Sequence, residues 1–316
     1  MKWNEASAIF LVVFTLVDAP TRPVSSGRGS HVPQVTLDRH LVTACKTTTT
    51  TTKIATWNVR TMLQKGKLDN IKLEMERMKI NILGLSEVRW QGAGVITSGN
   101  YKIFYSGGTT HERGVGIILD KEIGKAVKGY WTLSDRIILL KIAGKPLDIN
   151  IIQVYAPTSA CSDDDIEKFY EELEEVKTQC SQQNPLIIMG DFNAKVGEGR
   201  EENIVGPHGL GTRNLRGEKL VEWCKMNNLI IGNTWFQQPP RRKWTWKCPG
   251  EEIRNQIDFI LLRMLEGKRS RGKQREKLIE GLTDWLRAGK SLEAIEATKD
   301  RKKWRTMIAN AVKQGT

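Results

Sequence analysis

Short apolar runs, rather than long amphipathic stretches, dominate the chain from residue 53 onwards. Runs of about four to eight apolar or β-branched residues between turn residues are typical of strands. We predict strands within the segments KIATWNV, INILGLSEV, PLIIMGDFN, LIIGNT and NQIDFILL, and at residues 101–105, 114–119, 136–142 and 147–155.

Helical spacing is confined to three segments of this region. The first places Leu68, Ile71, Met75 and Met78 on one face, and the third lies near residues 217–227. The second, at about residues 164–183, carries an apolar stripe of Ile166, Phe169, Tyr170, Leu173, Val176 and Cys180. Strands outnumber helices about three to one and many are short, so the pattern favours an α+β sandwich, with two sheets face to face and helices outside.

Both ends of the chain differ from this middle section. Residues 1–52 lack periodicity, contain Pro, Ser and Gly, and end in a run of threonines, which predicts a disordered or leader segment. The apolar run AIFLVVFTLV resembles the core of a signal peptide, but Glu5 before it and Pro20 after it disfavour cleavage. We expect a nuclear or cytoplasmic protein rather than secretion through residues 1–19.

The C-terminal tail, residues 264–316, is strongly basic, with 14 Lys and Arg against 7 Asp and Glu. Its apolar spacing predicts two amphipathic helices, one lined by Leu278, Leu282, Trp285 and Leu286 and the other by Trp304, Ile308, Ala311 and Val312. An ordinary basic helical hairpin and a dedicated binding module both fit this pattern.

Composition narrows the functional classes. The 316 residues are 39% hydrophobic and 27% charged, which excludes collagen, a disulfide scaffold and disorder throughout. No internal apolar run approaches the roughly 20 residues of a membrane span, so we expect no membrane partner. Five cysteines without a CxxC pair indicate reduced thiols. The net charge of +13 favours a phosphate-rich partner such as nucleic acid.

Polar residues follow several of the predicted strands, where they could converge at one edge of a sandwich. They are Asn58, Glu87, Tyr155, Asp191, Asn193 and Asp258. Hard oxygen donors of this kind suit Mg²⁺, which takes only one or two protein carboxylates. Beside a phosphodiester, Asp191 could activate water, Asn193 could hold that water or the phosphate, and Tyr155 could donate a hydrogen bond to developing charge. Taken singly, each residue is also typical of a turn or a surface.

The ordered motifs TWNVR, SEVRW, VYAPT, GDFN and NQIDF together resemble the endonuclease/exonuclease/phosphatase superfamily. The resemblance spans residues 53–263. It is strongest to the apurinic-like endonuclease domain of RTE-type non-LTR retrotransposons and to the craniofacial development protein 2-like proteins derived from such elements. It implies a four-layer α/β/β/α sandwich and cleavage of a phosphodiester, typically DNA nicking, with Mg²⁺ or alternatively Mn²⁺ as the cofactor.

The resemblance also implies roles for the strand-end residues. Glu87 matches the principal metal ligand, with Asn58 beside the metal and phosphate. Tyr155 matches the active-site tyrosine, and Asp191 and Asn193 match the pair that activates water. Asp258 matches an aspartate that orients a histidine. Arg60 stands where some apurinic endonucleases have an acidic residue, which disfavours a second metal contact.

The chain departs from the family after Asp258. The family closes with Ser-Asp-His before a final core strand, but no such triplet follows here, and His31, His40, His111 and His208 all lie upstream. We therefore expect a C-terminally shortened domain with an open sheet edge and weak or lost activity. The tail resembles the end of the same elements' reverse transcriptase.

Two alternative functions remain open. A catalytically dead relict could still bind nucleic acid, and the best candidate segment contains Arg241, Arg242, Lys243, Trp244 and Trp246, whose cations and rings suit a backbone and unstacked bases. The same segment is equally compatible with a hairpin whose tryptophans are half buried. A phosphatase of inositol phosphates or other small phosphoesters is less favoured, because no small-ligand signature is present.

Overall fold

The computed structural model describes residues 10–16, 50–144, 147–248, 250 and 252–263. They all belong to one of two compact units, Met1–Leu265. The second unit, Glu266–Thr316, and with it the predicted helical tail, lies outside the described residues.

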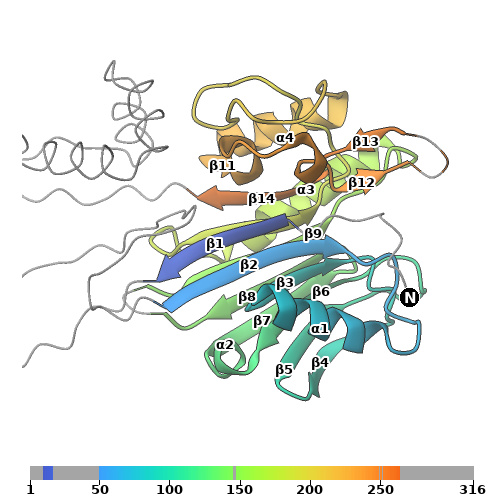
Figure 1. Ribbon diagram of the computed structural model, residues 1–316, viewed down its shortest axis with the longest axis vertical. Coiled ribbons are helices and arrows are strands. Elements are labelled where there is room, and N and C mark those ends of the chain that lie inside the picture. Colours follow the sequence, from blue (N-terminus) through green and yellow to red (C-terminus); the bar gives the residue numbers. More distant parts are fainter. Residues whose placement is uncertain (1–9, 17–49, 145–146, 249, 251, 264–316) are drawn as a thin grey trace, which may run out of the picture. The chain divides into compact units, whose positions relative to one another are not determined.

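Two six-stranded sheets form the centre of the first unit (Figure 1). In spatial order, the first sheet contains β1 (Phe10–Leu16), β2 (Thr50–Asn58), β3 (Ile82–Ser86), β6 (Val115–Asp120), β5 (Tyr101–Ser106) and β4 (Ala93–Ser98). The second contains β11 (Leu229–Ile231), β14 (Asp258–Arg263), β10 (Leu186–Asp191), β9 (Ile149–Tyr155), β8 (Ile137–Ile142) and β7 (Val127–Ser134). Both are mixed sheets, since β2 pairs parallel with β3 and β9 pairs parallel with β10.

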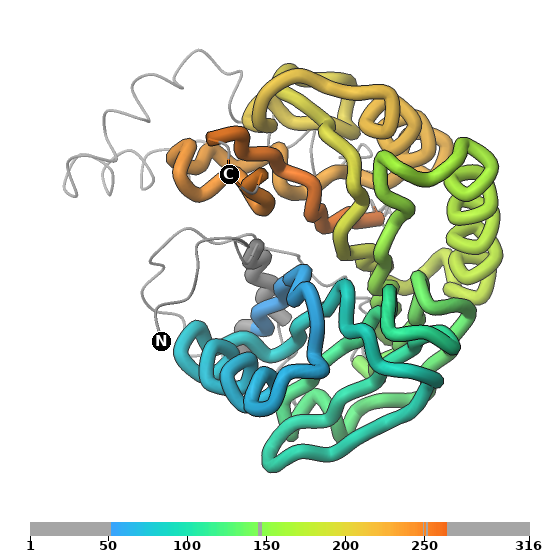
Figure 2. Tube along the Cα trace, turned by 90° about the vertical axis from the view of Figure 1, so that its right-hand side faces the viewer, coloured from blue at the N-terminus to red at the C-terminus, as the bar shows by residue number. Residues whose placement is uncertain are grey.

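Helices cover the outer faces of the two sheets (Figures 1 and 2). Helix α1 (Lys67–Met78) packs on the first sheet, whereas α3 (Asp163–Thr178) and α4 (Leu215–Met226) pack on the second. The shorter elements are α2 (Lys121–Lys125), the 3-10 helices η1 (Gly232–Trp235) and η2 (Pro240–Arg242), and a small hairpin of β12 (Trp246–Lys247) and β13 (Arg254–Asn255). The predicted four-layer α/β/β/α sandwich is confirmed.

Three apolar clusters hold the layers together. The one between the sheets includes Ile54, Ile138 and Met189, which explains why central strands are buried on both faces. The predicted stripe of α1 buries Ile71 and Met75 against the first sheet. The stripe of α3 buries Ile166, Phe169, Leu173 and Val176 against the second.

Helix α3 is shorter than its sequence pattern suggested. It begins with a capping box, in which the Ser162 hydroxyl accepts from Asp165 N and the Asp165 side chain accepts from Ser162 N. It ends at Thr178 rather than near residue 183. Cys180 still lies in the apolar cluster, because the chain tightens after the helix with Cys180 N donating to Lys177 O.

The N-terminal region differs from the expected disorder where it is described. Strand β1 pairs antiparallel with β2, and Val13 lies opposite Lys53. Strand β2 itself starts at Thr50, three residues before the predicted start at Lys53. The edge of β2 is therefore paired rather than open. None of the helices in the described part of the chain has the length and apolarity to span a bilayer.

Candidate active site

Strand register brings the predicted polar residues to one edge of the sandwich. In the first sheet Asn58 lies opposite Ser86, and Glu87 follows directly. In the second sheet Asp191 lies between Tyr155 and Asp258. Ser86 ties the two sheets together, since its hydroxyl donates to Val154 O at 3.0 Å and accepts from Asp191 N at 3.4 Å. The convergence expected from the sequence is present.

Asn58 is the hub of this site. Its side-chain nitrogen Nδ2 donates to Glu87 Oε1 at 2.9 Å and to Asp191 Oδ2 at 2.8 Å. Its Oδ1 accepts from Arg60 N at 3.0 Å, and Arg60 has a left-handed φ of 57°. A neutral donor thus bridges two carboxylates, one from each sheet, and reduces their mutual repulsion.

Glu87 leaves β3 with a φ of 56°, a conformation that turns its side chain toward this edge. Its Oε2 accepts from the Arg89 guanidinium at 2.8 Å, and its Oε1 also accepts from the Tyr155 hydroxyl at 3.3 Å. The following backbone is pinned, because Val88 N donates to Gly114 O. Glu87 therefore has a fixed position at the mouth of the site.

Tyr155 is held from behind by Arg136. The guanidinium donates to Tyr155 O at 3.0 Å and lies 5.5 Å from the centre of the Tyr155 ring. Burial, followed by the charges of Glu87 and Asp191, raises the pKa of Tyr155, and Arg136 opposes this shift. The phenol therefore remains a neutral hydrogen-bond donor at physiological pH.

Asp191 is buried at the end of β10, and its carboxylate is fixed at both oxygens. Asn193 N donates to Asp191 Oδ1 at 2.9 Å, while Asn58 holds Oδ2. Burial, aided by the Glu87 charge, raises the pKa of Asp191 to about 6, and the hydrogen bonds from Asn58 and Asn193 oppose the rise. A carboxylate with this pKa is ionised at neutral pH and basic enough to accept a proton from water.

The residues on either side of Asp191 and Phe192, Gly190 and Asn193, fix the backbone of the GDFN turn. Gly190 has a φ of 148°, and a Cβ there would lie 2.0 Å from Val154 O, so only glycine fits. Asn193 has a φ of 46°, and its Nδ2 donates to Ala156 O at 2.8 Å. The motif GDFN is thus both a tight turn and part of the site.

Asp258 is buried beside Asp191 and lacks a full set of partners. Its backbone N donates to Thr245 Oγ1 at 3.1 Å, whereas its carboxylate Oδ1 has no hydrogen-bond partner in the described part of the chain. Burial, and then the charge of Asp191, raise the pKa of Asp258 well above its ordinary value. The Asn233 side chain holds the backbone of the same strand, since its Nδ2 donates to Asp258 O and its Oδ1 accepts from Ile260 N, each at 2.9 Å.

The oxygen donors of the site fit a small divalent cation. Glu87 and Asp191 provide carboxylate oxygens, which are hard ligands of the kind that Mg²⁺ and Mn²⁺ prefer. Asn58 turns its amide nitrogen toward both carboxylates and its Oδ1 toward Arg60 N, so its amide would have to rotate before its oxygen could bind the ion. Among residues 50–144, 147–248 and 252–263, no three His, Cys, Asp or Glu side chains form a closed metal cage. The arrangement suits an ion that keeps most of its waters.

The basic, Trp-containing segment lies next to this site. Arg241 and Arg242 are exposed on η2, and Trp244 is half buried with the Arg254 guanidinium 5.2 Å from its ring. Trp246 is half buried in β12, and Lys243 Nζ donates to Gly209 O at 3.1 Å. Thr245, which sequence reasoning missed, links the segment to Asp258.

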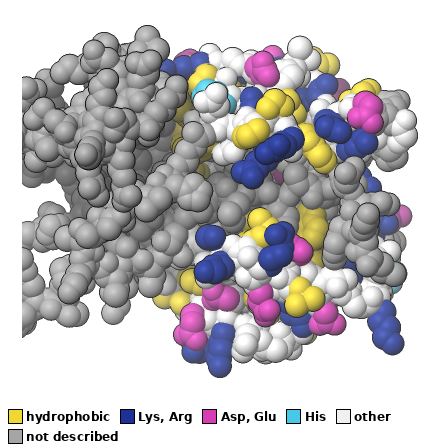
Figure 3. Space-filling view, in the orientation of Figure 1, with side chains coloured by type: hydrophobic (Ala, Val, Ile, Leu, Met, Phe, Trp, Pro, Cys, Tyr) yellow, Lys and Arg dark blue, Asp and Glu magenta, His cyan; other side chains and the backbone are white. Residues whose placement is uncertain are grey.

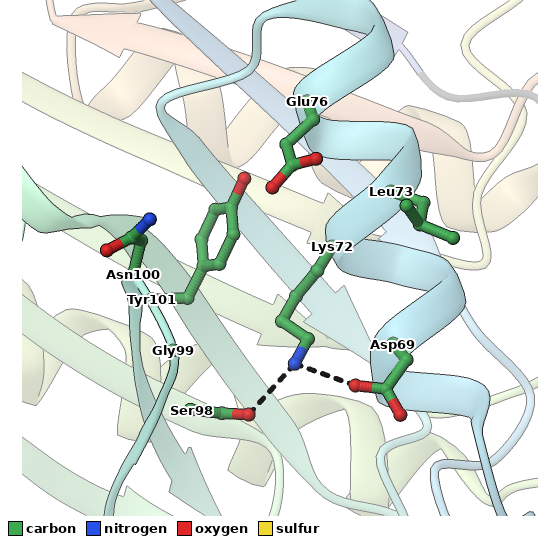
Figure 4. Close-up of a pocket in the computed structure, with 8 residues that line it drawn as sticks. All are labelled: Asp69, Lys72, Leu73, Glu76, Ser98, Gly99, Asn100 and Tyr101. Atoms are coloured by element: carbon green, nitrogen blue, oxygen red, sulfur yellow. Dashed lines mark hydrogen bonds and ion pairs between the residues drawn. The ribbon is translucent and has the colours of Figure 1, made fainter.

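Charge on the visible face in Figure 3 is mixed, with Lys and Arg side chains interspersed among acidic and apolar ones. A pocket of about 360 Å³ lies elsewhere, between α1 and the β4–β5 turn, and none of the strand-end residues lines it (Figure 4). Lys72 spans it, pairing with Asp69 at 2.7 Å and Ser98 Oγ at 2.9 Å. The strand-end edge, rather than this pocket, is the candidate active site.

The chain belongs to the endonuclease/exonuclease/phosphatase family, whose sequence pattern matches residues 55–267. It is similar to craniofacial development protein 2 of Bos taurus, with 44% identity over 211 residues, covering 66% of this chain and 36% of the relative. The protein of the same name from Tragulus javanicus is 43% identical over 211 residues, covering 66% and 37%. The chain thus spans just over a third of the length of these curated relatives.

Solved structures with a similar arrangement include the endonuclease domain of TRAS1, a telomere-specific non-LTR retrotransposon. That domain has 17% identity and a TM-score of 0.45, covering 66% of this chain and 84% of that chain. An AP endonuclease from Archaeoglobus fulgidus has 17% identity and a TM-score of 0.49, covering 66% and 85%.

Proposed function

We propose that the chain is a retrotransposon-derived, divalent-metal-dependent phosphodiesterase of the DNA-endonuclease type, with weak or lost activity. The observation that carries this proposal is the Asn58 side chain, which bonds Glu87 from one sheet and Asp191 from the other. Two carboxylates held close together by one neutral donor at a sheet edge suit a hydrolytic site in which one carboxylate binds a metal ion and the other accepts a proton.

Each residue has a separate task in this proposal. Glu87, with Asn58, would hold Mg²⁺ or Mn²⁺, which when bound polarises a phosphoryl oxygen and stabilises the leaving group. Asp191 accepts a proton from the attacking water. Asn193 N and Asn58 Nδ2 hold the two oxygens of the Asp191 carboxylate. The Tyr155 hydroxyl, which donates to Glu87 Oε1 in this structure, would donate toward charge that develops on the phosphate.

The expected weakness of catalysis rests on Asp258. In the resemblance its counterpart orients a histidine, but Asp258 Oδ1 has no donor in the described part of the chain. Loss of one positioned acid–base group typically costs about 10²–10⁴ in rate. The same observation favours a second candidate, a catalytically inactive nucleic-acid-binding protein.

Nucleic acid, DNA in preference to RNA, is the proposed partner in either case. Exposed Arg241 and Arg242 can meet phosphates, and half-buried Trp244 and Trp246 can meet bases at the border of the site. The thiols of Cys161, Cys180 and Cys224 form no disulfide among the described residues, which is typical of a reducing compartment and supports a proposed location in the nucleus or cytoplasm.

Nicking of supercoiled plasmid tests these proposals. Cleavage that needs Mg²⁺ or Mn²⁺, stops with EDTA and disappears in Asp191→Ala would identify a working nuclease. Tight DNA binding without cleavage would identify the inactive alternative, and a chimera carrying a family Ser-Asp-His segment and last strand after Leu262 should then regain cleavage. Release of free phosphate from small phosphoesters, without nicking, would contradict both.

A further inference from the structure

Arg89 stands at the mouth of the site with one charged partner. It follows Glu87 by two residues, and its guanidinium lies 2.8 Å from Glu87 Oε2. The Arg89 side chain is 39% exposed, whereas that of Glu87 is 16% exposed. Its Nε is buried and lacks a hydrogen-bond partner within the described residues. The guanidinium therefore faces Glu87 on one side and solvent on the other.

The Arg89 backbone is fixed, in contrast to its side chain. Arg89 has a left-handed φ of 61°, and its N donates to Arg113 O at 2.6 Å. His111 Nδ1 lies 2.7 Å from Arg89 O on the other side of the residue. Because the main chain is anchored twice, the guanidinium can move only by rotating its side chain between Glu87 and the outside.

The donors on Glu87 are not equivalent. Asn58 and Tyr155 are neutral, come from β2 and β9, and share Oε1. Arg89 is positively charged, comes from a loop and occupies Oε2. A divalent cation at Glu87 would repel the guanidinium and compete for that oxygen. Arg89 is therefore the donor that must leave.

We propose that Arg89 is a positioning residue, which holds the Glu87 carboxylate until a divalent cation binds and then turns outward to contact a phosphate of the nucleic acid. This inference rests on the proposed function, because it requires the metal at Glu87. Arg89 holds Glu87 through one nitrogen only, and a planar guanidinium that leaves a carboxylate can bind a phosphate through two parallel N–H groups.

Two further arginines add positive charge near Arg89. Arg113 lies on the loop bonded to Arg89, and Arg136 lies behind Tyr155. Burial lowers the pKa of Arg136 and the charge of Arg113 lowers it further, so the two cations lie near one another.

Calorimetric titration with Mn²⁺ distinguishes direct competition between Arg89 and the ion for Glu87 from a general effect of removing one positive charge. We expect Arg89→Ala to tighten Mn²⁺ binding by about threefold to tenfold, because a competing charge is removed. Arg113→Ala is the matched control, since Arg113 is 43% exposed and pairs with Asp135 at 3.5 Å rather than with Glu87. It should change the affinity by less than about twofold. Arg89→Gln, whose side chain is neutral but still polar and longer than alanine, is a second variant in case Arg89→Ala does not fold.

Binding of a labelled DNA duplex in Ca²⁺ tests the second half of the proposal. Arg89→Ala should weaken it, although the same variant binds Mn²⁺ more tightly. Three results would overturn the role of Arg89. The first is that Arg89→Ala and Arg89→Gln bind Mn²⁺ no more tightly than the wild type. The second is that Arg113→Ala tightens Mn²⁺ binding as much as Arg89→Ala does, and the third is that Arg89→Ala binds DNA as tightly as the wild type. If Glu87→Ala binds Mn²⁺ as tightly as the wild type, or if neither the wild type nor Arg89→Ala binds it, the proposed metal site fails as well.

Discussion

The Asn58 amide nitrogen lies 2.8 Å from Asp191 Oδ2, although the two residues are 133 positions apart in the chain. This hydrogen bond favours the ionised form of Asp191 and works against the burial that raises its pKa to about 6. Asn58 thus sets how basic the candidate proton acceptor is, in addition to its place beside Glu87.

Removing this donor should move the titration of Asp191. In Asn58→Ala, we expect the pKa of Asp191 to rise from about 6 by about one pH unit, because a charge-assisted hydrogen bond is lost. Carboxyl-carbon NMR of the metal-free protein measures this without requiring activity. Asn81→Ala is the control, since Asn81 donates to Asp120 at 2.6 Å away from the site. An unmoved Asp191 titration in Asn58→Ala would contradict the assignment.

Asp258 should lower the stability of the folded protein at neutral pH. Its pKa is raised from 3.8 by burial, so between that value and its folded pKa the unfolded chain gives up a proton that the folded chain keeps. Its effect on stability is thus most favourable below about pH 4 and becomes unfavourable as the pH rises. An asparagine side chain does not titrate, so Asp258→Asn should raise the melting temperature by about 5 °C at about pH 8 and by little at about pH 4.

Thermal melts in EDTA of both proteins at the two pH values would measure this difference. Glu167→Gln provides the control, because Glu167 is 65% exposed and its pair with Lys219, at 3.3 Å, is at the surface. A gain in Asp258→Asn that is equal at both pH values would show that the carboxyl does not titrate as inferred.

How well the sequence predicted each element depended on its burial. Strand β10 (Leu186–Asp191) is buried at every position, so its continuous apolar run was a clear signal. Strands β4 (Ala93–Ser98) and β7 (Val127–Ser134) were missed, because both are edge strands with largely exposed or half-buried residues and no clean alternation. Helix α2, of five residues, is too short to show a period.

The candidate site was predictable only in part, for a related reason. The sequence indicated the polar residues at strand ends, because they occur in a characteristic order along the chain. They are Asn58, Glu87, Tyr155, Asp191 and Asp258. The residues that hold them, such as Arg136 behind Tyr155 and Thr245 beneath Asp258, act across tertiary contacts that no local pattern records. The motif SEVRW contained Arg89, but its ion pair depends on the left-handed backbone at Glu87 and at Arg89 itself.

The basic tail offers a prediction about nucleic-acid affinity. Residues 264–316 carry 14 Lys and Arg against 7 Asp and Glu. If the tail contacts phosphates, its deletion should reduce the slope of log affinity against log salt, because each contact releases about 0.9 counterion. Fluorescence anisotropy with a DNA duplex at several salt concentrations measures the slope. Arg241→Ala/Arg242→Ala in the full chain gives the contribution of η2 separately, and identical slopes for full and shortened chains would remove the tail from the interface.

The pairing of β1 with β2 protects one edge of the first sheet. An unpaired edge leaves backbone N–H and C=O groups free to pair with another chain. The antiparallel register sets Val13 opposite Lys53, whereas Thr51 lies opposite Thr15. Directly opposed Cα atoms are about 4.5–5.5 Å apart, within the reach of a disulfide, and diagonal neighbours are beyond it.

Cysteine pairs therefore test the register. Val13→Cys/Lys53→Cys should form a disulfide on mild oxidation, as read by mass spectrometry of the digested protein, whereas Val13→Cys/Thr51→Cys should not. Deletion of residues 1–17 should in turn lower the melting temperature and promote association, because the edge of β2 loses its partner. Equal cross-linking of both pairs would show that β1 has no fixed register. A deletion variant as stable and as monomeric as the full chain would show that β2 does not need this strand.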